Sequence, residues 1–394
     1  MKLVLIELNE INFDALSFYI ERGEHLPGFK KLIEKGIVNT EAEHYYENLE
    51  PWIQWSSVHT GKTFEDHKIF RLGDIVNSSE DQFFEKVENA GFSVGAVSPM
   101  NAENMLKNSA YFIPDPWTQT PCDNSFISKS ITKAIVQAVN DNSQKKLKFK
   151  TVINLVMAFF ALVKLSSYFK MIKYALKAFG KPWRKALFLD MLLYEIHKTL
   201  FKRKSPNFST LFLNAGAHIQ HHYFFNSPYV DSKELKNPDW YIGKDFDPFL
   251  EMLKVYDEML CDLFYMQNTE IIIATGLSQK PYEQLKFYYR IKEHASFLKE
   301  VGVEFKDVVP RMTRDFLISF DTKEQALKAE KQLSKILVNN EVRLFEEIDN
   351  RGIDIFVVLT YPSEITDKTT ISYLGKELLL NDLVTFVAIK NGEH

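Results

Sequence analysis

The chain alternates short, continuously apolar runs with amphipathic segments of helical period. The apolar runs lie at residues 3–8, 92–97, 209–214 and 270–275. Runs that are apolar throughout are typical of strands buried on both faces of a parallel sheet. The helical patterns lie at residues 12–22, 26–36 and 80–90. Strands that alternate with helices predict an α/β fold, with a mostly parallel sheet and helices on both of its faces.

Two stretches depart from this alternation and suggest the domain organisation. Residues 126–205 are rich in helix-forming and basic residues. We interpret them as a basic amphipathic helical insert between a first part of the α/β core, residues 1–125, and a second part, residues 206–394. Within the second part, strand-like and helical patterns at about 310–362 predict a small α+β lobe.

Charge is distributed unevenly along the chain. The formal net charge is −4, yet residues 145–204 hold 15 Lys and Arg and only two acidic residues. The longest uncharged run there, residues 151–163, is too short to span a bilayer. Basic residues then recur at roughly helical spacing among apolar ones: Lys164, Lys170, Lys173 and Lys177. This pattern favours an anionic membrane surface as partner of 145–204, the alternative being a helical cap with solvated lysines.

Composition excludes several classes of protein. Two cysteines, Cys122 and Cys261, cannot form a disulfide framework and fit a reducing compartment. The N-terminus enters a strand pattern directly, without the pattern of a signal peptide, so we expect a cytoplasmic protein, peripheral on the inner face of the membrane. Glycine-rich phosphate loops and zinc-finger spacings are missing from the sequence. The acidic balance outside the insert argues against a nucleic-acid partner.

Six segments carry a resemblance to a known family. They are the first strand and its polar end (3–16), LPGFKKLIEKGI (26–37), EPWIQWSSVHTGKTFEDHKIF (50–70), NAGAHIQHHYF (214–224), IIIATGLSQ (271–279) and FVAIKNGEH (386–394). Their order resembles the alkaline phosphatase superfamily, and within it the type I phosphodiesterase/nucleotide pyrophosphatase and sulfatase-like branch. The resemblance implies an alkaline-phosphatase-like fold with a cleft for a phosphorylated or nucleotide-linked substrate.

Most of that family's chemistry is missing here. The positions where the resemblance implies metal-ligand acids, a nucleophile and an Asp-His pair hold other residues: Asn9, Pro51, Ala217, Gly276 and Leu277. Only the histidines that match His221 and His394 are kept. Two zinc ions each need three or four N, O or S ligands, which this set does not provide. We therefore expect no metal, no cofactor and no phosphoryl-enzyme route.

Polar residues that follow the predicted strands are the candidates for a site, because the carboxyl ends of parallel strands meet at one crevice. We expect Glu7, Glu10 and His221 to be catalytic. The residues expected to bind substrate are Asn9, Asn12, Trp52, Gln54, Asn214, His218, Thr275, Gln279 and Lys280.

Structural alternatives stay open for several of these residues. Glu7 lies within an apolar strand, where a buried carboxylate needs a partner, so it is either a paired structural residue or a general base. Asn9 and Asn12 are also ordinary turn and cap residues. Residues 50–53 (EPWI) are also compatible with a simple turn.

Three functions fit these observations. The first is a metal-independent group-transfer enzyme, a glycosyltransferase that moves a nucleotide-activated sugar to a lipid-linked glycan acceptor in bacterial surface-glycan assembly at the membrane. The second is a non-catalytic scaffold of the same fold. The third is a phosphodiesterase or phosphatase with a rearranged metal site, built from His218, His221, His222 and His394.

Overall fold

A computed structural model describes residues 2–143, 163–311, 314–373 and 375–394 of the chain. The expected uncharged run at 151–163 therefore lies outside the described residues, apart from Val163. The chain forms two compact units, each with its own sheet and core. Unit 1 comprises Met1–Asp231, Lys244–Pro281 and Gly392–His394, and unit 2 comprises Ser232–Gly243 and Tyr282–Asn391.

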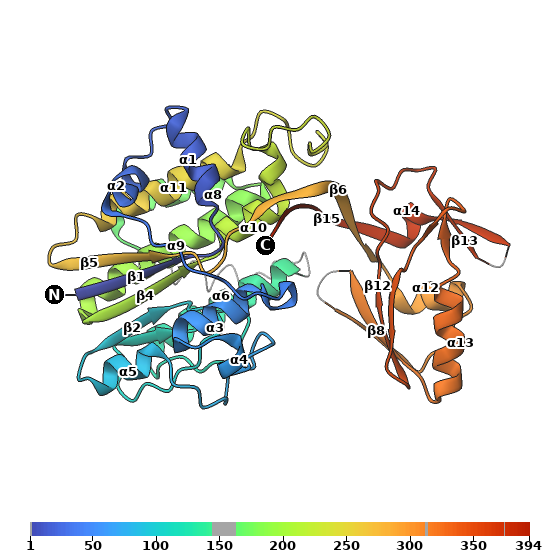
Figure 1. Ribbon diagram of the computed structural model, residues 1–394, viewed down its shortest axis with the longest axis horizontal. Helices are drawn as coiled ribbons and strands as arrows, with labels where there is room; N and C mark the ends of the chain where they lie inside the picture. Colours follow the sequence, from blue (N-terminus) through green and yellow to red (C-terminus); the bar gives the residue numbers. More distant parts are fainter. Residues whose placement is uncertain (1, 144–162, 312–313, 374) are drawn as a thin grey trace. The chain divides into compact units, whose positions relative to one another are not determined.

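Unit 1 is built on a parallel sheet (Figure 1). Its strands are β1 (Lys2–Leu8), β2 (Val94–Val97), β3 (Tyr111–Ile113), β4 (Phe208–Leu213) and β5 (Thr269–Ala274). They lie in the order β3-β2-β4-β1-β5, and every neighbouring pair is parallel. The predicted α/β class with a parallel sheet is confirmed. β1 lies between β4 and β5, so the polar residues after these three strands meet at one edge.

Helices cover both faces of this sheet, as predicted. Phe84 packs with Leu5 and Phe208 on one face. The neighbouring Ser209 faces the opposite side, because successive side chains of a strand alternate, and its hydroxyl lies 2.9 Å from His197 Nε2. The helices of unit 1 are α1 (Phe13–Glu21), α2 (Pro27–Lys35), α3 (Pro51–Thr60), α4 (Phe64–His67), α5 (Phe83–Asn89), α6 (Phe126–Ser143), α8 (Leu165–Lys177), α9 (Pro182–Lys204), α10 (Ala215–Tyr223) and α11 (Pro248–Leu263), with short 3-10 turns at η1 (Tyr46–Asn48) and η2 (Phe224–Asn226).

Unit 2 is mainly antiparallel. One sheet has the order β11-β12-β8-β7 and a second the order β10-β9-β13-β14, while β15 pairs with β6. The strands are β6 (Lys280–Ile291), β7 (Asp307–Pro310), β8 (Asp315–Ser319), β9 (Leu337–Val338), β10 (Val342–Arg343), β11 (Glu347–Asn350), β12 (Asp354–Val358), β13 (Thr370–Tyr373), β14 (Lys376–Leu379) and β15 (Val384–Glu393). The helices are α12 (His294–Glu300), α13 (Lys323–Leu333) and α14 (Leu380–Leu383). Phe316, Ile318 and Ile355 belong to its separate apolar core.

None of the helices that the structure describes is both long and apolar enough to cross a membrane.

Candidate functional site

The chain turns sharply where β1 ends, and this turn positions Glu10. The amide of Asn9 donates to the carbonyl of Leu213 at 3.0 Å, and the amide of Glu10 donates to the carbonyl of Thr275 at 2.9 Å. The loop after β1 is thus fixed to the ends of both neighbouring strands. Glu10 has a φ of 62°, the left-handed region, which is unfavourable for a residue with a side chain. Such strain persists where the surroundings enforce it, and it is often found at functional sites.

The Glu10 carboxylate is buried against two imidazoles. Its Oε2 lies 3.3 Å from His221 Nε2 and 3.5 Å from His394 Nδ1. Oε2 also accepts a hydrogen bond from Gln279 Nε2, and Oε1 accepts one from Asn9 Nδ2. Burial opposes ionisation of this carboxyl, but the hydrogen bond and charge of His221, together with His394 and Gln279, outweigh it and hold the pKa of Glu10 below its ordinary value. Glu10 is therefore an anion in the folded protein at neutral pH.

Glu10, His221 and His394 form a set of potential metal ligands. Their ligand atoms all lie within 4.8 Å of one another. One carboxylate and two imidazoles are suitable ligands for zinc and for other first-row transition metals, and three protein ligands leave coordination positions open. The His221 side chain is 34% exposed, so the set is accessible from solvent. These residues fit one ion. They do not fit a two-ion site, because Asn9, Ala217 and Gly276 stand where the resemblance implies metal-ligand acids.

The alternative metal site made of four histidines is only partly reproduced. His221 and His394 belong to the ligand set, and Glu10 joins them. Within the part of the chain that the structure describes, His218 and His222 belong to no such group. His218 lies on α10, where burial and the charge of His221 lower its pKa to about 4, so its ring is neutral at physiological pH. Its ring centroid lies 4.8 Å from that of His222.

Asn9 connects the site to its neighbours. Its Nδ2 donates to Asn214 Oδ1 at 2.8 Å, and its Oδ1 accepts from Trp55 Nε1 at 2.7 Å. The amide is thereby fixed in one orientation, with donors directed to Glu10 and Asn214. Trp55 is fully buried beside Phe212.

Two glutamines and a glycine pack beside Glu10. Gln220 Nε2 donates to the Glu10 carbonyl at 2.7 Å, and Gln220 Oε1 accepts from the amide of Asn12 at 3.1 Å. Gly392 leaves the room that the chain end needs, because a Cβ there would lie 2.2 Å from Gln279 Oε1 and 2.9 Å from the Gln220 carbonyl oxygen. Asn12 caps α1 by accepting from the amide of Ala15 at 2.7 Å and donates to the Gln279 carbonyl at 2.6 Å.

Other predicted residues lie elsewhere in unit 1. Glu7 is not part of the Glu10 group: its Oε1 lies 3.4 Å from His59 Nε2, and both side chains are fully buried. This is the paired arrangement of the structural alternative. Trp52 Nε1 donates to the Phe70 carbonyl, and Gln54 Nε2 donates to the Asn48 carbonyl. Residues 50–53 form the start of α3 rather than a simple turn.

Thr275, directly after β5, and Lys280, the first residue of β6, have other partners. Thr275 contributes its carbonyl oxygen to the turn at Glu10. Lys280 Nζ lies 3.3 Å from Glu393 Oε1, an ion pair next to the last ligand in the sequence.

Glu50 is a functional candidate that the sequence did not single out. It is the N-terminal flanking residue of α3, and it is half-buried. Burial and the negative charge of Glu10 raise its pKa, so this carboxyl retains its proton to higher pH than an ordinary Glu. Two carboxyls with pKa values displaced in opposite directions are typical of an acid and a base that work together. The only signal in the sequence was a Glu directly before Pro51, the position of the missing nucleophile.

Comparisons with known proteins give a likeness of fold alone. No protein-family model and no curated protein matches the chain. Among solved structures, the chain is similar to phosphonoacetate hydrolase from Sinorhizobium meliloti 1021 in complex with phosphonoformate, with a TM-score of 0.40, 14% identity, and coverage of 92% of this chain and 82% of that one. The complex of that hydrolase with phosphonoacetate gives a TM-score of 0.41 and 15% identity, with coverage of 99% and 89%.

Proposed function

We propose that unit 1 is a hydrolase that acts on a phosphorylated or related anionic substrate with the help of one divalent transition-metal ion. The observation that carries the proposal is the group of Glu10, His221 and His394, whose ligand atoms lie within 4.8 Å of one another. The group lies at the carboxyl ends of parallel strands, where α/β proteins bind their ligands. The order of sequence segments that resembles the alkaline phosphatase superfamily supports the substrate class.

The ion would be held by Glu10, His221 and His394, and it would supply positive charge and a water molecule of lowered pKa. The other residues have separate tasks. Asn9 and Gln279 orient the Glu10 carboxylate through their amide donors. Glu50 is the proton donor for a leaving group, because it is protonated to higher pH than an ordinary Glu.

A metal-free group transfer from a nucleotide-activated sugar to a lipid-linked acceptor is the second candidate. It is favoured by the same carboxylate–imidazole pair, Glu10 with His221 at 3.3 Å, which can move a proton without an ion. A non-catalytic scaffold is the third candidate, and it requires neither an ion nor a substrate.

One experiment separates these candidates. The protein, freed of metal by a chelator, is titrated with zinc and with manganese, and hydrolysis of chromogenic phosphate monoesters and diesters is followed in parallel. We expect one ion bound per chain and hydrolysis that returns with the ion. Chelator-insensitive binding and turnover of a nucleotide sugar would support group transfer instead. Protein that binds neither ion nor nucleotide would overturn both catalytic proposals.

A further inference from the structure

Helix α8 presents an apolar stripe to solvent. Leu165, Phe169 and Leu176 are 84%, 79% and 74% exposed, and Ile172 lies between them. These positions are separated by three or four residues, so they share one face of the helix. Phe179, directly after the helix, is 90% exposed and extends the stripe. Large apolar side chains gathered on one exposed face are unusual and mark an interaction surface.

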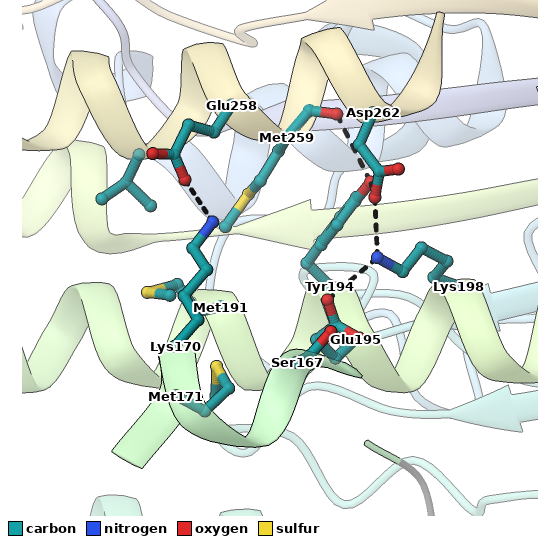
Figure 2. Close-up of a pocket in the computed structure, with 11 residues that line it drawn as sticks. Ser167, Lys170, Met171, Met191, Tyr194, Glu195, Lys198, Glu258, Met259 and Asp262 are labelled. Carbon is teal, nitrogen blue, oxygen red and sulfur yellow. Dashed lines mark hydrogen bonds and ion pairs between the residues drawn. The ribbon is translucent and has the colours of Figure 1, made fainter. Parts of the chain in front are cut away.

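The opposite face of α8 is attached to unit 1. Met171 and Ala178 are buried there. Lys170 forms an ion pair with Glu258 of α11, across a cavity of about 190 Å³ that α8, α9 and α11 line (Figure 2). Lys170 is therefore directed at the protein and differs from the other lysines expected to face a membrane. The helix is held by its inner side, and its apolar outer side is left exposed.

The charge around the stripe identifies the occupant. Residues 163–189 contain seven Lys and Arg and no acidic residue. Lys173 and Lys177 are exposed on α8 at one border of the stripe. An apolar face bordered by lysines matches the interface of an anionic bilayer, where side chains insert below the headgroups and ammonium groups meet phosphates. A helix of 13 residues is about 20 Å long, suited to lying in the plane of the interface rather than to crossing it.

We propose that α8 docks unit 1 on an anionic phospholipid bilayer. Leu165, Phe169, Ile172, Leu176 and Phe179 enter the headgroup and acyl boundary, and Lys173 and Lys177 bind lipid phosphates. The proposal rests on the exposed face of α8 and is independent of the chemistry at Glu10. It places catalysis, or group transfer, next to a membrane surface.

The test uses the full chain and flotation with vesicles. Wild-type protein should float with vesicles of phosphatidylcholine mixed with phosphatidylglycerol, and poorly with phosphatidylcholine alone. Phe169→Ser with Leu176→Ser should reduce the partition coefficient at least roughly tenfold, as should Lys173→Glu with Lys177→Glu. The matched control is Phe92→Ser with Tyr265→Ser, which removes exposed aromatic rings elsewhere and should leave partition unchanged.

All these substitutions are at exposed positions, so equal melting temperatures confirm that the variants are folded. A second readout is Phe169→Trp, whose fluorescence should shift to the blue on anionic vesicles and be quenched by brominated lipid. Wild-type protein that does not float, or flotation unchanged in the Phe169/Leu176 variant, would overturn the proposal. A third result would also overturn it: wild-type protein that is dimeric and does not bind vesicles, with a Phe169/Leu176 variant that is monomeric. The stripe would then bind a second copy of the chain rather than a membrane.

Discussion

Replacing Glu10 by Gln tests the proposed metal site most directly. The substitution keeps the length of the side chain and removes its negative charge. It also replaces one carboxylate oxygen by an amide nitrogen, which donates hydrogen bonds. In wild type the two oxygens of Glu10 accept from Gln279 and Asn9 and face two imidazoles. The carboxylate is the anionic member of the ligand set, so we expect a large loss of affinity for the ion.

The size of the effect follows from linkage between binding and folding. At a free ion concentration 100 times the dissociation constant, binding adds about 2.7 kcal/mol to the free energy of unfolding. Losing an outer-shell partner costs about 10–100-fold in affinity, so losing the Glu10 ligand should cost at least about 100-fold. The same ion concentration then adds only about 0.4 kcal/mol. At about 2–4 °C per kcal/mol, a wild-type rise of about 5–10 °C in Tm falls to about 1 °C in Glu10→Gln.

The assay is a thermal melt of chelator-treated protein with increasing zinc, repeated with manganese. The rise in Tm should weaken at acid pH, because protons compete with the ion for its ligands. His222→Gln is the control, because His222 is the neighbouring imidazole on α10 and lies outside the ligand set. It should respond to zinc as wild type does. Equal responses of Glu10→Gln and wild type, or no response of wild type, would refute the site.

Three further substitutions give separate tests. Glu50→Gln should keep metal binding and lose hydrolysis. Wild-type hydrolysis should fall as pH rises through the raised pKa of Glu50, because the carboxyl then loses the proton that it donates. Rates of hydrolysis measured across pH check this. Burial raises the pKa of Asp190 to about 6, so the folded state takes up its proton before the unfolded state does. Stability relative to Asp190→Asn should therefore rise by about 2 kcal/mol as pH falls from 7 to 4; urea unfolding at both pH values measures it. Gly392→Ala should lower stability by about 1–3 kcal/mol and weaken zinc binding, because its Cβ would meet Gln279 and Gln220; thermal melts with and without zinc record both effects.

Much of the fold follows from local pattern, and the convergence of the site follows from topology. Asn9 and Asn214 lie together because they end neighbouring parallel strands. Glu7 was assigned to the same crevice, yet it lies within β1, and alternation along the strand directs it, like Leu5, to one face of the sheet, where it meets His59 of α3. Its place within the strand rather than after it was the missing consideration.

Other features depend on contacts that no local pattern encodes. Gln220 is a buried residue within α10, and its hydrogen bonds to Glu10 and Asn12 appear only when the end of β1 and α10 are brought together. Glu50 became a candidate only through burial and the charge of Glu10, which together raise its pKa in the folded protein. The role of Glu10 depends on a left-handed turn that is fixed by two other strands, which a single stretch of sequence cannot predict.

The order of unit 2 and His394 along the chain has a consequence for the proposed metal site. Residues 282–391 separate the last ligand from Glu10 and His221 in the sequence. When unit 2 is folded, β6 and β15 are paired, so the chain enters and leaves unit 2 along neighbouring strands. When unit 2 unfolds, His394 becomes the end of a flexible tether on the order of 100 residues, and its effective concentration at the other two ligands falls steeply. Binding of the ion would then depend on whether unit 2 is folded, although unit 2 contributes no ligand of its own.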